Sequence, residues 1–98
     1  MALRDDYNFE YLVNEAERLV IDELERRLEA DTGGRICRCQ DCVLDMAAYA
    51  LNSVKPAYRV SLLGKLYGEA LSEAQFQEEV RRAVDKGIEV VRTNPSHD

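Results

Sequence analysis

Residues 35–42 have the sequence RICRCQDC, which contains all three cysteines of the chain. The cysteines follow a C-x-C-x-x-C spacing, directly before the apolar run VLDMAAYALN. A C-x-x-C pair at a turn that enters a helix is a common half of a zinc site, because zinc prefers thiolate and imidazole ligands. Cys39 and Cys42 form such a pair, and Cys37 lies near enough to supply a third sulfur. The stretch therefore predicts a structural zinc site at the start of a central helix.

A closed structural site takes four protein ligands, so the three cysteines need one more. The only histidine of the chain, His97, completes the site if the last helix runs antiparallel to the central one and returns to the cysteines. A histidine at such a position is otherwise usually a solvated side chain. Three free buried cysteines are the main alternative to zinc. Three other sites are less favoured. An iron–sulfur cluster normally needs four cysteines, and a redox C-x-x-C pair normally follows a strand, which is not recognisable here. A catalytic zinc would need a general base nearby, and the sequence offers none.

Composition and charge bound the remaining possibilities. The chain has 98 residues, of which 46% are hydrophobic, and we expect a single domain over residues 1–98 with its core at about 8–97. A net charge of −6 opposes DNA binding, which needs many basic side chains to neutralise phosphates. No segment resembles a signal peptide or a transmembrane helix. We therefore expect a cytoplasmic protein that does not contact membranes, where clustered cysteines favour metal over disulfides.

The first predicted helix covers residues 9–30, where apolar residues recur at intervals of three and four. Asn8 is a plausible N-cap, and the sequence DTGG at residues 31–34 ends the helix, with two glycines that can adopt left-handed conformations. On the exposed face we expect two acid-first ion pairs at i,i+4, namely Asp22 with Arg26 and Glu23 with Arg27.

The second predicted helix covers residues 43–52 and is apolar nearly all round, as expected for a central element. Asp45 interrupts this run, and a buried aspartate would need a hydrogen-bonding partner. Pro56 ends the helix, and residues 58–63 can form an edge strand or an extended arm.

The third predicted helix extends to about residue 92. Ser72 and Gln75 form a capping box at its start, and Pro95 stops it. Its apolar residues keep helical spacing: Phe76, Val80, Ala83, Val84, Gly87, Ile88 and Val91. Together these segments predict a mainly α protein, a small domain of three to four helices with a structural zinc site.

Residues 37–58 have the sequence CRCQDCVLDMAAYALNSVKPAY. This segment resembles the central motif of the late competence protein ComFB family, in which a cysteine cluster precedes an aspartate, an Ala-Leu-Asn triplet and a Pro-x-Tyr. The matching residues here are the three cysteines, Asp45, residues 50–52, Pro56 and Tyr58. The helices on either side match in layout, so the resemblance covers most of the chain. After Tyr58 the chain departs from many relatives, with Arg-Val-Ser where they have Val and then Thr or Ser.

The resemblance implies an intertwined α-helical homodimer with one structural zinc in each subunit. Family members complete that site with a cysteine or histidine near the C-terminus, and the matching residue here is His97. The family is associated with natural competence and motility control. Several members are receptors for cyclic dinucleotide second messengers, and ligand specificity can differ where this chain departs from them.

A locally basic segment follows the central helix. No Asp or Glu occurs between Met46 and Gly68, whereas Lys55, Arg59 and Lys65 lie there. Lys and Arg can bind the phosphates of a cyclic dinucleotide, and Tyr58 or Tyr67 can stack on a base. The alternative is that these charges are ordinary exposed ones and that the tyrosines pack in a dimer interface. Among these residues the candidate ligand contacts are Lys55, Tyr58 and Arg59.

We therefore predict a non-enzymatic signalling protein that binds a cyclic dinucleotide, c-di-GMP or c-di-AMP, as a homodimer. The alternative is a zinc-stabilised dimeric adaptor that binds a protein partner and no small ligand. The downstream partner is not predicted by the sequence. An enzyme is less favoured, because no acid–base pair accompanies the cysteines.

Overall fold

The computed structural model describes residues 2–60 and 73–95. In these residues the fold is mainly helical, as the sequence predicts, with one small sheet of two strands. In chain order the elements are α1 (Leu3–Asp6), the 3-10 helix η1 (Phe9–Tyr11), β1 (Val13–Asn14), α2 (Glu15–Ala30), α3 (Gln40–Ser53), β2 (Tyr58–Arg59) and α4 (Glu73–Thr93). No helix in the described ranges is both long and apolar enough to cross a membrane.

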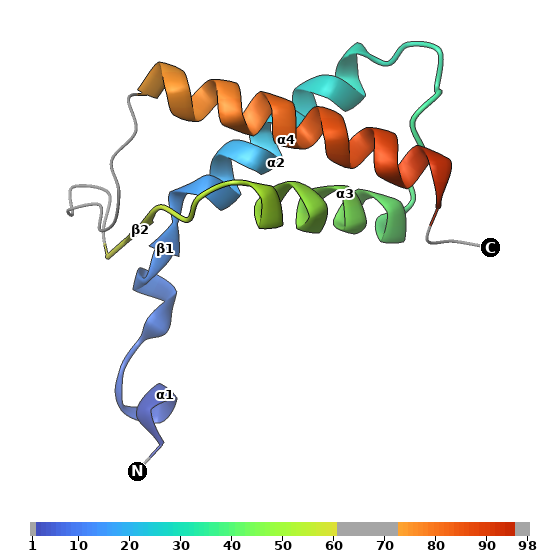
Figure 1. The fold of residues 1–98 in the computed structure, drawn as a ribbon. Coiled ribbons are helices and arrows are strands. Elements are labelled where there is room, and N and C mark those ends of the chain that lie inside the picture. Colours follow the sequence, from blue (N-terminus) through green and yellow to red (C-terminus); the bar gives the residue numbers. More distant parts are fainter. Residues whose placement is uncertain (1, 61–72, 96–98) are drawn as a thin grey trace.

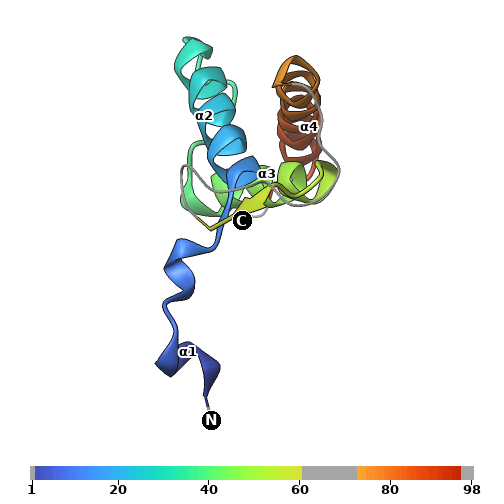
Figure 2. The same ribbon diagram turned by 90° about the vertical axis from the view of Figure 1, so that its left-hand side faces the viewer.

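The three long helices form the body of the molecule. α3 and α4 run antiparallel along one another, and α2 packs against both (Figures 1 and 2). β1 precedes α2 and pairs antiparallel with β2, which follows α3. Residues 2–12, which we call the N-terminal arm, extend away from the helices with α1 at their tip (Figure 1).

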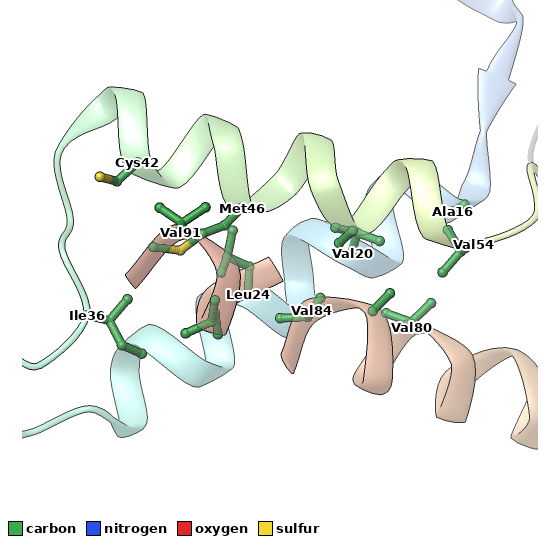
Figure 3. Close-up of a cluster of buried hydrophobic side chains, with 13 residues drawn as sticks. Ala16, Val20, Leu24, Ile36, Cys42, Met46, Val54, Val80, Val84 and Val91 are labelled. Carbon is green, nitrogen blue, oxygen red and sulfur yellow. The ribbon is translucent and has the colours of Figure 1, made fainter. Parts of the chain in front are cut away.

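The core is built from one face of each long helix (Figure 3). Helical spacing of three and four places these apolar side chains on a common stripe. α3 contributes Cys42, Met46 and Ala50, which are almost completely buried. The remaining members include Ala16, Val20 and Leu24 of α2 and Val80, Ala83, Val84, Ile88 and Val91 of α4. The predicted spacing of α4 is confirmed. α3 was expected to be covered nearly all round, but only one of its faces is buried, and Leu44 on the opposite face is 56% exposed.

Gly87 lets α4 approach the backbone of α3. A Cβ atom at this position would lie 2.9 Å from the carbonyl oxygen of Met46, and 3.6 Å from the ring of Tyr49. The first distance is too short for a carbon–oxygen contact, and a backbone oxygen cannot rotate away as a side chain can. A glycine in mid-helix is therefore required here by close packing, at the expense of helix propensity.

The first predicted helix begins later than the sequence analysis placed it. Asn8 caps only the short η1, where its Oδ1 accepts a hydrogen bond from the amide of Glu10 at 2.9 Å. The true N-cap of the long helix is Asn14, whose Oδ1 accepts from the amides of Ala16 at 3.2 Å and Ala57 at 2.8 Å. The second bond reaches a residue after α3, so local periodicity could not place this boundary.

An ion pair lies beside the same N-cap. Nε and Nη2 of Arg59 both donate to Oε2 of Glu15, at 3.1 and 2.5 Å, and the amide of Glu15 donates to the carbonyl of Ala57 at 2.8 Å. We call these contacts of Asn14 and Glu15 with Ala57 and Arg59 the clasp. Burial alone would raise the pKa of Glu15, but the hydrogen bonds from Arg59 and from Arg18 outweigh it and lower that pKa.

The exposed charges of α2 pair differently from the predicted i,i+4 pattern. Arg26 binds Glu23, three residues earlier, at 2.6 Å instead of Asp22. Arg27 reaches Asp85 of α4 at 2.9 Å instead of Glu23. Contact with a neighbouring helix thus decided the partner of Arg27, which a helix considered alone cannot reveal.

Smaller predictions have mixed outcomes. Asp45 is exposed, so it does not require the buried partner that the sequence suggested. Of the two glycines after α2, only Gly34 has a positive φ, of 64°. β2 covers the first two residues of the predicted 58–63 extended segment, whose remainder lies partly outside the described residues, as does Ser72 of the capping box. α4 ends at Thr93, before Pro95, as predicted.

Gly87→Ala should destabilise the protein. Alanine gains about 0.5–1 kcal/mol of helix propensity, but overpacking against a backbone atom usually costs about 1–3 kcal/mol. We expect a lower free energy of unfolding in urea. Gly33→Ala is the matched control, because a Cβ there meets only the flexible side chain of Arg35 at 3.6 Å. A Gly87→Ala variant as stable as the wild type would contradict the close approach.

Glu15→Gln should lower stability near neutral pH by about 1–2 kcal/mol, because a charge-assisted hydrogen bond is replaced by a neutral one. The pKa of Glu15 in the folded state lies below its ordinary value of 4.5. Its contribution is therefore complete well above that value and is lost as the pH falls through the lower folded-state pKa. Urea unfolding of both proteins across the acid range should show the gap closing. An exposed neighbour, Glu17→Gln, serves as control, and a gap that does not depend on pH would be evidence against the ion pair.

Candidate metal centre and ligand-binding segment

The three cysteines come together at the N-terminus of α3. Cys37 lies on the loop after α2, Cys39 is the N-cap residue of α3, and Cys42 lies in its first turn. Their Sγ atoms are all within 4.8 Å of one another. Cys42 is completely buried, whereas Cys37 and Cys39 are half-buried. The structure therefore confirms that these residues form one cluster.

The cluster suits a thiophilic metal ion. At a Zn–S distance of 2.3 Å, two thiolates of a tetrahedral site lie about 3.8 Å apart, so small side-chain movements suffice to bring these sulfurs into place. The amide of Cys42 donates to Sγ of Cys39 at 3.4 Å. Together with the dipole of α3, this bond favours negative charge on the sulfur. In the described residues the group contains only cysteines, with no carboxylate among them.

The loop that carries Cys37 is held by two side chains that the sequence analysis did not use in this way. Oδ2 of Asp31 accepts from the amide of Ile36 at 2.8 Å. Nη2 of Arg38 donates to the carbonyls of Leu28 and Asp31, at the C-terminal end of α2. The amide of Ile36, and less strongly the amide of Arg35 and the charges of Arg38 and Arg35, hold the pKa of Asp31 below its ordinary value. The aspartate that begins the DTGG turn was the available signal, because aspartates in turns often bond nearby backbone amides.

The fourth predicted ligand, His97, lies outside the described residues. The arrangement of the helices bears on it nonetheless. The C-terminal end of α4 lies at the same end of the bundle as the N-terminus of α3 (Figure 1). Val91 and Cys42 also belong to one cluster of buried side chains (Figure 3). The antiparallel course on which the prediction of His97 rested is therefore observed, and the ligand itself remains a prediction.

The three candidate ligand contacts lie beyond the other end of α3 and differ in exposure. Lys55 is exposed, and Tyr58 keeps 45% of its surface accessible. Arg59 is only 9% exposed and is bound to Glu15. A ligand can therefore reach Lys55 and Tyr58 directly, whereas it could contact Arg59 only beside Glu15, to which Arg59 is bound.

The cysteine cluster and the candidate ligand contacts are separate in the fold. They lie at opposite ends of α3, whose 14 residues span about 20 Å. Within one chain, the cysteines therefore cannot touch a ligand at Tyr58.

A charged hollow lies close to the cysteine cluster. It has a volume of about 380 Å³ and opens between α2, the cysteine loop and α4, with Ile36 and Ile88 among its lining residues. Its lining includes the acidic residues Asp31, Asp85 and Glu89 and the basic residues Arg27, Arg35, Arg82, Lys86 and Arg92. Three of these arginines are paired: Arg27 with Asp85, Arg82 with Glu78 and Arg92 with Glu89. The sequence analysis missed this hollow, because its residues come from three separate segments.

Comparison with known proteins gives one match. The family described as late competence development protein ComFB matches residues 13–95 of the 98-residue chain. No curated protein and no solved structure matches the chain. The matched range contains α2, α3, α4 and the three cysteines, which is most of the chain. The chain therefore belongs to the late competence development protein ComFB family.

Proposed function

We propose that this chain is a non-enzymatic signalling protein that binds a cyclic dinucleotide, c-di-GMP or c-di-AMP, and is stabilised by structural zinc. The observation that carries the proposal is the segment after α3. There the chain presents Lys55 and Tyr58 to solvent beside Arg59, with no acidic residue between Met46 and Val60. The chain belongs to the ComFB family, and the resemblance described above implies cyclic dinucleotide receptors among its members, which supports the same function.

The proposed pocket supplies the two kinds of contact that a cyclic dinucleotide needs. The exposed ring of Tyr58 offers a face for base stacking. Lys55 and the guanidinium of Arg59 offer positive charge for phosphate, and the planar guanidinium suits its oxygens. We propose that the protein acts as a homodimer, so that these groups occur twice in the assembly.

Zinc is assigned a structural role in this proposal. Three cysteines and His97 would close the coordination shell, which leaves no open position for a reacting water or substrate. The metal would join the loop after α2, the start of α3 and the segment after α4. A core built from three helices gains much from such a link, because small domains bury a limited fraction of their surface.

A dimeric adaptor without a small ligand is the second candidate function. The observation in its favour is the N-terminal arm, on which Leu3, Tyr7, Phe9, Tyr11 and Leu12 are all exposed. Apolar and aromatic residues of this kind are frequent in protein–protein interfaces. A ligand-binding measurement separates the two functions.

The purified protein should contain about one zinc ion per chain, and removing it with a chelator should lower the melting temperature strongly. We expect a fall of more than about 10 °C, because each kcal/mol moves the melting temperature of a domain this size by about 4–8 °C. Cys42→Ser should lose both the metal and the stability. Gln40→Ala, which lies between the ligands, is the control and should retain zinc.

His97→Ala should retain zinc more weakly than the wild type, as measured by competition with a chromogenic chelator. Zinc content and affinity equal to those of the wild type would show that another group is the fourth ligand. A metal-free wild type that is as stable as the zinc-loaded protein would contradict the structural role altogether.

Isothermal titration of the zinc-loaded protein with c-di-GMP and c-di-AMP should detect binding of at least one of them. Tyr58→Ala should weaken it about tenfold or more, because stacking on an aromatic ring contributes about 1–3 kcal/mol. Lys55→Gln should weaken it and make it less sensitive to salt. Tyr11→Ala is the matched control for the tyrosine, since Tyr11 is exposed on the arm.

Lys86→Gln is the control for the lysine and also tests the charged hollow between α2 and α4. A loss of affinity in Lys86→Gln with none in Lys55→Gln would move the ligand to that hollow. The absence of heat with either nucleotide, at high protein concentration, would exclude the receptor function and leave the adaptor.

A further inference from the structure

We propose that Glu15 occupies the phosphate-binding position of Arg59, and that a ligand phosphate exchanges with Glu15 and thereby weakens the clasp. This inference rests on the proposed function and concerns how that same site is regulated. Glu15 is thus an internal competitor of the ligand.

The first argument is the contact itself. Two nitrogens of one edge of the Arg59 guanidinium donate to a single carboxylate oxygen of Glu15. The oxygens of a phosphate can accept from these same two nitrogens, as bidentate arginine–phosphate pairs do. The side chains of Arg59 and Glu15 are only 10% and 17% exposed, so their attraction is weakly screened. An anion that approaches Arg59 while Glu15 remains there meets a neutralised cation and a nearby negative charge.

The second argument is that Glu15 has another partner. Its Oε1 accepts from Nε of Arg18 at 2.6 Å, and the side chain of Arg18 is 58% exposed. When Glu15 leaves Arg59 it can stay paired with Arg18 at the surface of α2, so neither carboxylate nor guanidinium is left unpaired. This makes exchange with a phosphate feasible, where displacement of a singly paired buried acid would be costly.

The third argument concerns what the exchange releases. β1 and β2 pair over only two positions, Val13 with Arg59 and Asn14 with Tyr58. Besides this pairing, Asn14 and Glu15 connect the start of α2 to the segment after α3 through the contacts of the clasp. Loss of the Glu15–Arg59 pair weakens this connection at the base of the N-terminal arm. The ligand would therefore change the mobility of the arm, which carries exposed aromatic side chains.

Glu15→Gln tests the exchange, with Glu17→Gln as a matched control on the exposed face of α2. Titration of each zinc-loaded protein with c-di-GMP and c-di-AMP should show an affinity about fivefold or more higher in Glu15→Gln, because a competing charge has been removed. Glu17→Gln should bind like the wild type, and Arg59→Met should lose affinity. Circular dichroism at the titration temperature shows that each variant is folded.

Hydrogen exchange provides a second readout. In the wild type, a bound nucleotide should speed the exchange of the amides of Glu15 and Ala57, which bond within the clasp. A protein that binds nucleotide with slower exchange of these amides, or with equal affinities in Glu15→Gln and Glu17→Gln, would overturn the exchange while leaving the receptor function intact.

Inorganic phosphate tests the exchange at Arg59 independently of the receptor function. If no cyclic dinucleotide binds the wild type, the receptor function fails, and the anion site at Arg59 can still be measured. Phosphate, compared with chloride at equal ionic strength, should raise the melting temperature of Glu15→Gln more than that of Glu17→Gln. The difference should vanish in the double variant Glu15→Gln, Arg59→Met. Equal shifts in Glu15→Gln and Glu17→Gln would overturn the proposal.

Discussion

The close packing of α3 against α4 is the constraint on which the rest of the structure depends. Cys42, Met46 and Ala50 bury one face of α3, and Gly87 brings the backbone of α4 against the carbonyl of Met46. Apolar contact fixes the middle of α3 in this way. Cys42 in the first turn of α3 and Val54 at its C-cap extend this core to both ends of the helix. Polar groups add to it near each end, and they are of a different kind at each.

At the N-terminus of α3 these polar groups are the sulfurs of the cysteines. Beyond its C-terminus they are the amide of Ala57, bonded to Asn14, and the Glu15–Arg59 ion pair. The loop that brings Cys37 to the other two cysteines is held by Asp31 and Arg38, and Arg38 also bonds the carbonyl of Leu28 near the end of α2. The clasp joins the start of α2 to Ala57 and Arg59. Both ends of α2 are thus tied to the segments that flank α3, which explains how three helices with a small core keep one arrangement.

Local patterns in the sequence predicted the features that depend on neighbouring residues. The apolar run after the cysteines predicted α3, and the spacing of apolar residues predicted α4. The C-x-C-x-x-C spacing predicted the cluster, because all three cysteines lie within six residues. The predicted start of the first long helix was wrong, because its N-cap Asn14 is held by the amide of Ala57, 43 residues away. The burial of Arg59 was missed for the same reason, because its partner Glu15 is 44 residues away. A charge in a basic segment looks exposed until its counter-ion is known.

Loss of a metal from the cysteine cluster and loss of the Glu15–Arg59 pair would have different effects on the fold. A bound metal adds its binding free energy to folding, so its removal acts on the whole domain. The Glu15–Arg59 pair acts on one contact between the start of α2 and β2, and Arg18 keeps Glu15 paired when that contact opens. A group on which the whole fold depends is poorly suited to respond to a ligand, because any response would unfold the protein. A local contact with an alternative partner can open while the core of α2, α3 and α4 stays packed. The clasp therefore has the properties of a responsive element, and the cysteine cluster has those of a permanent one.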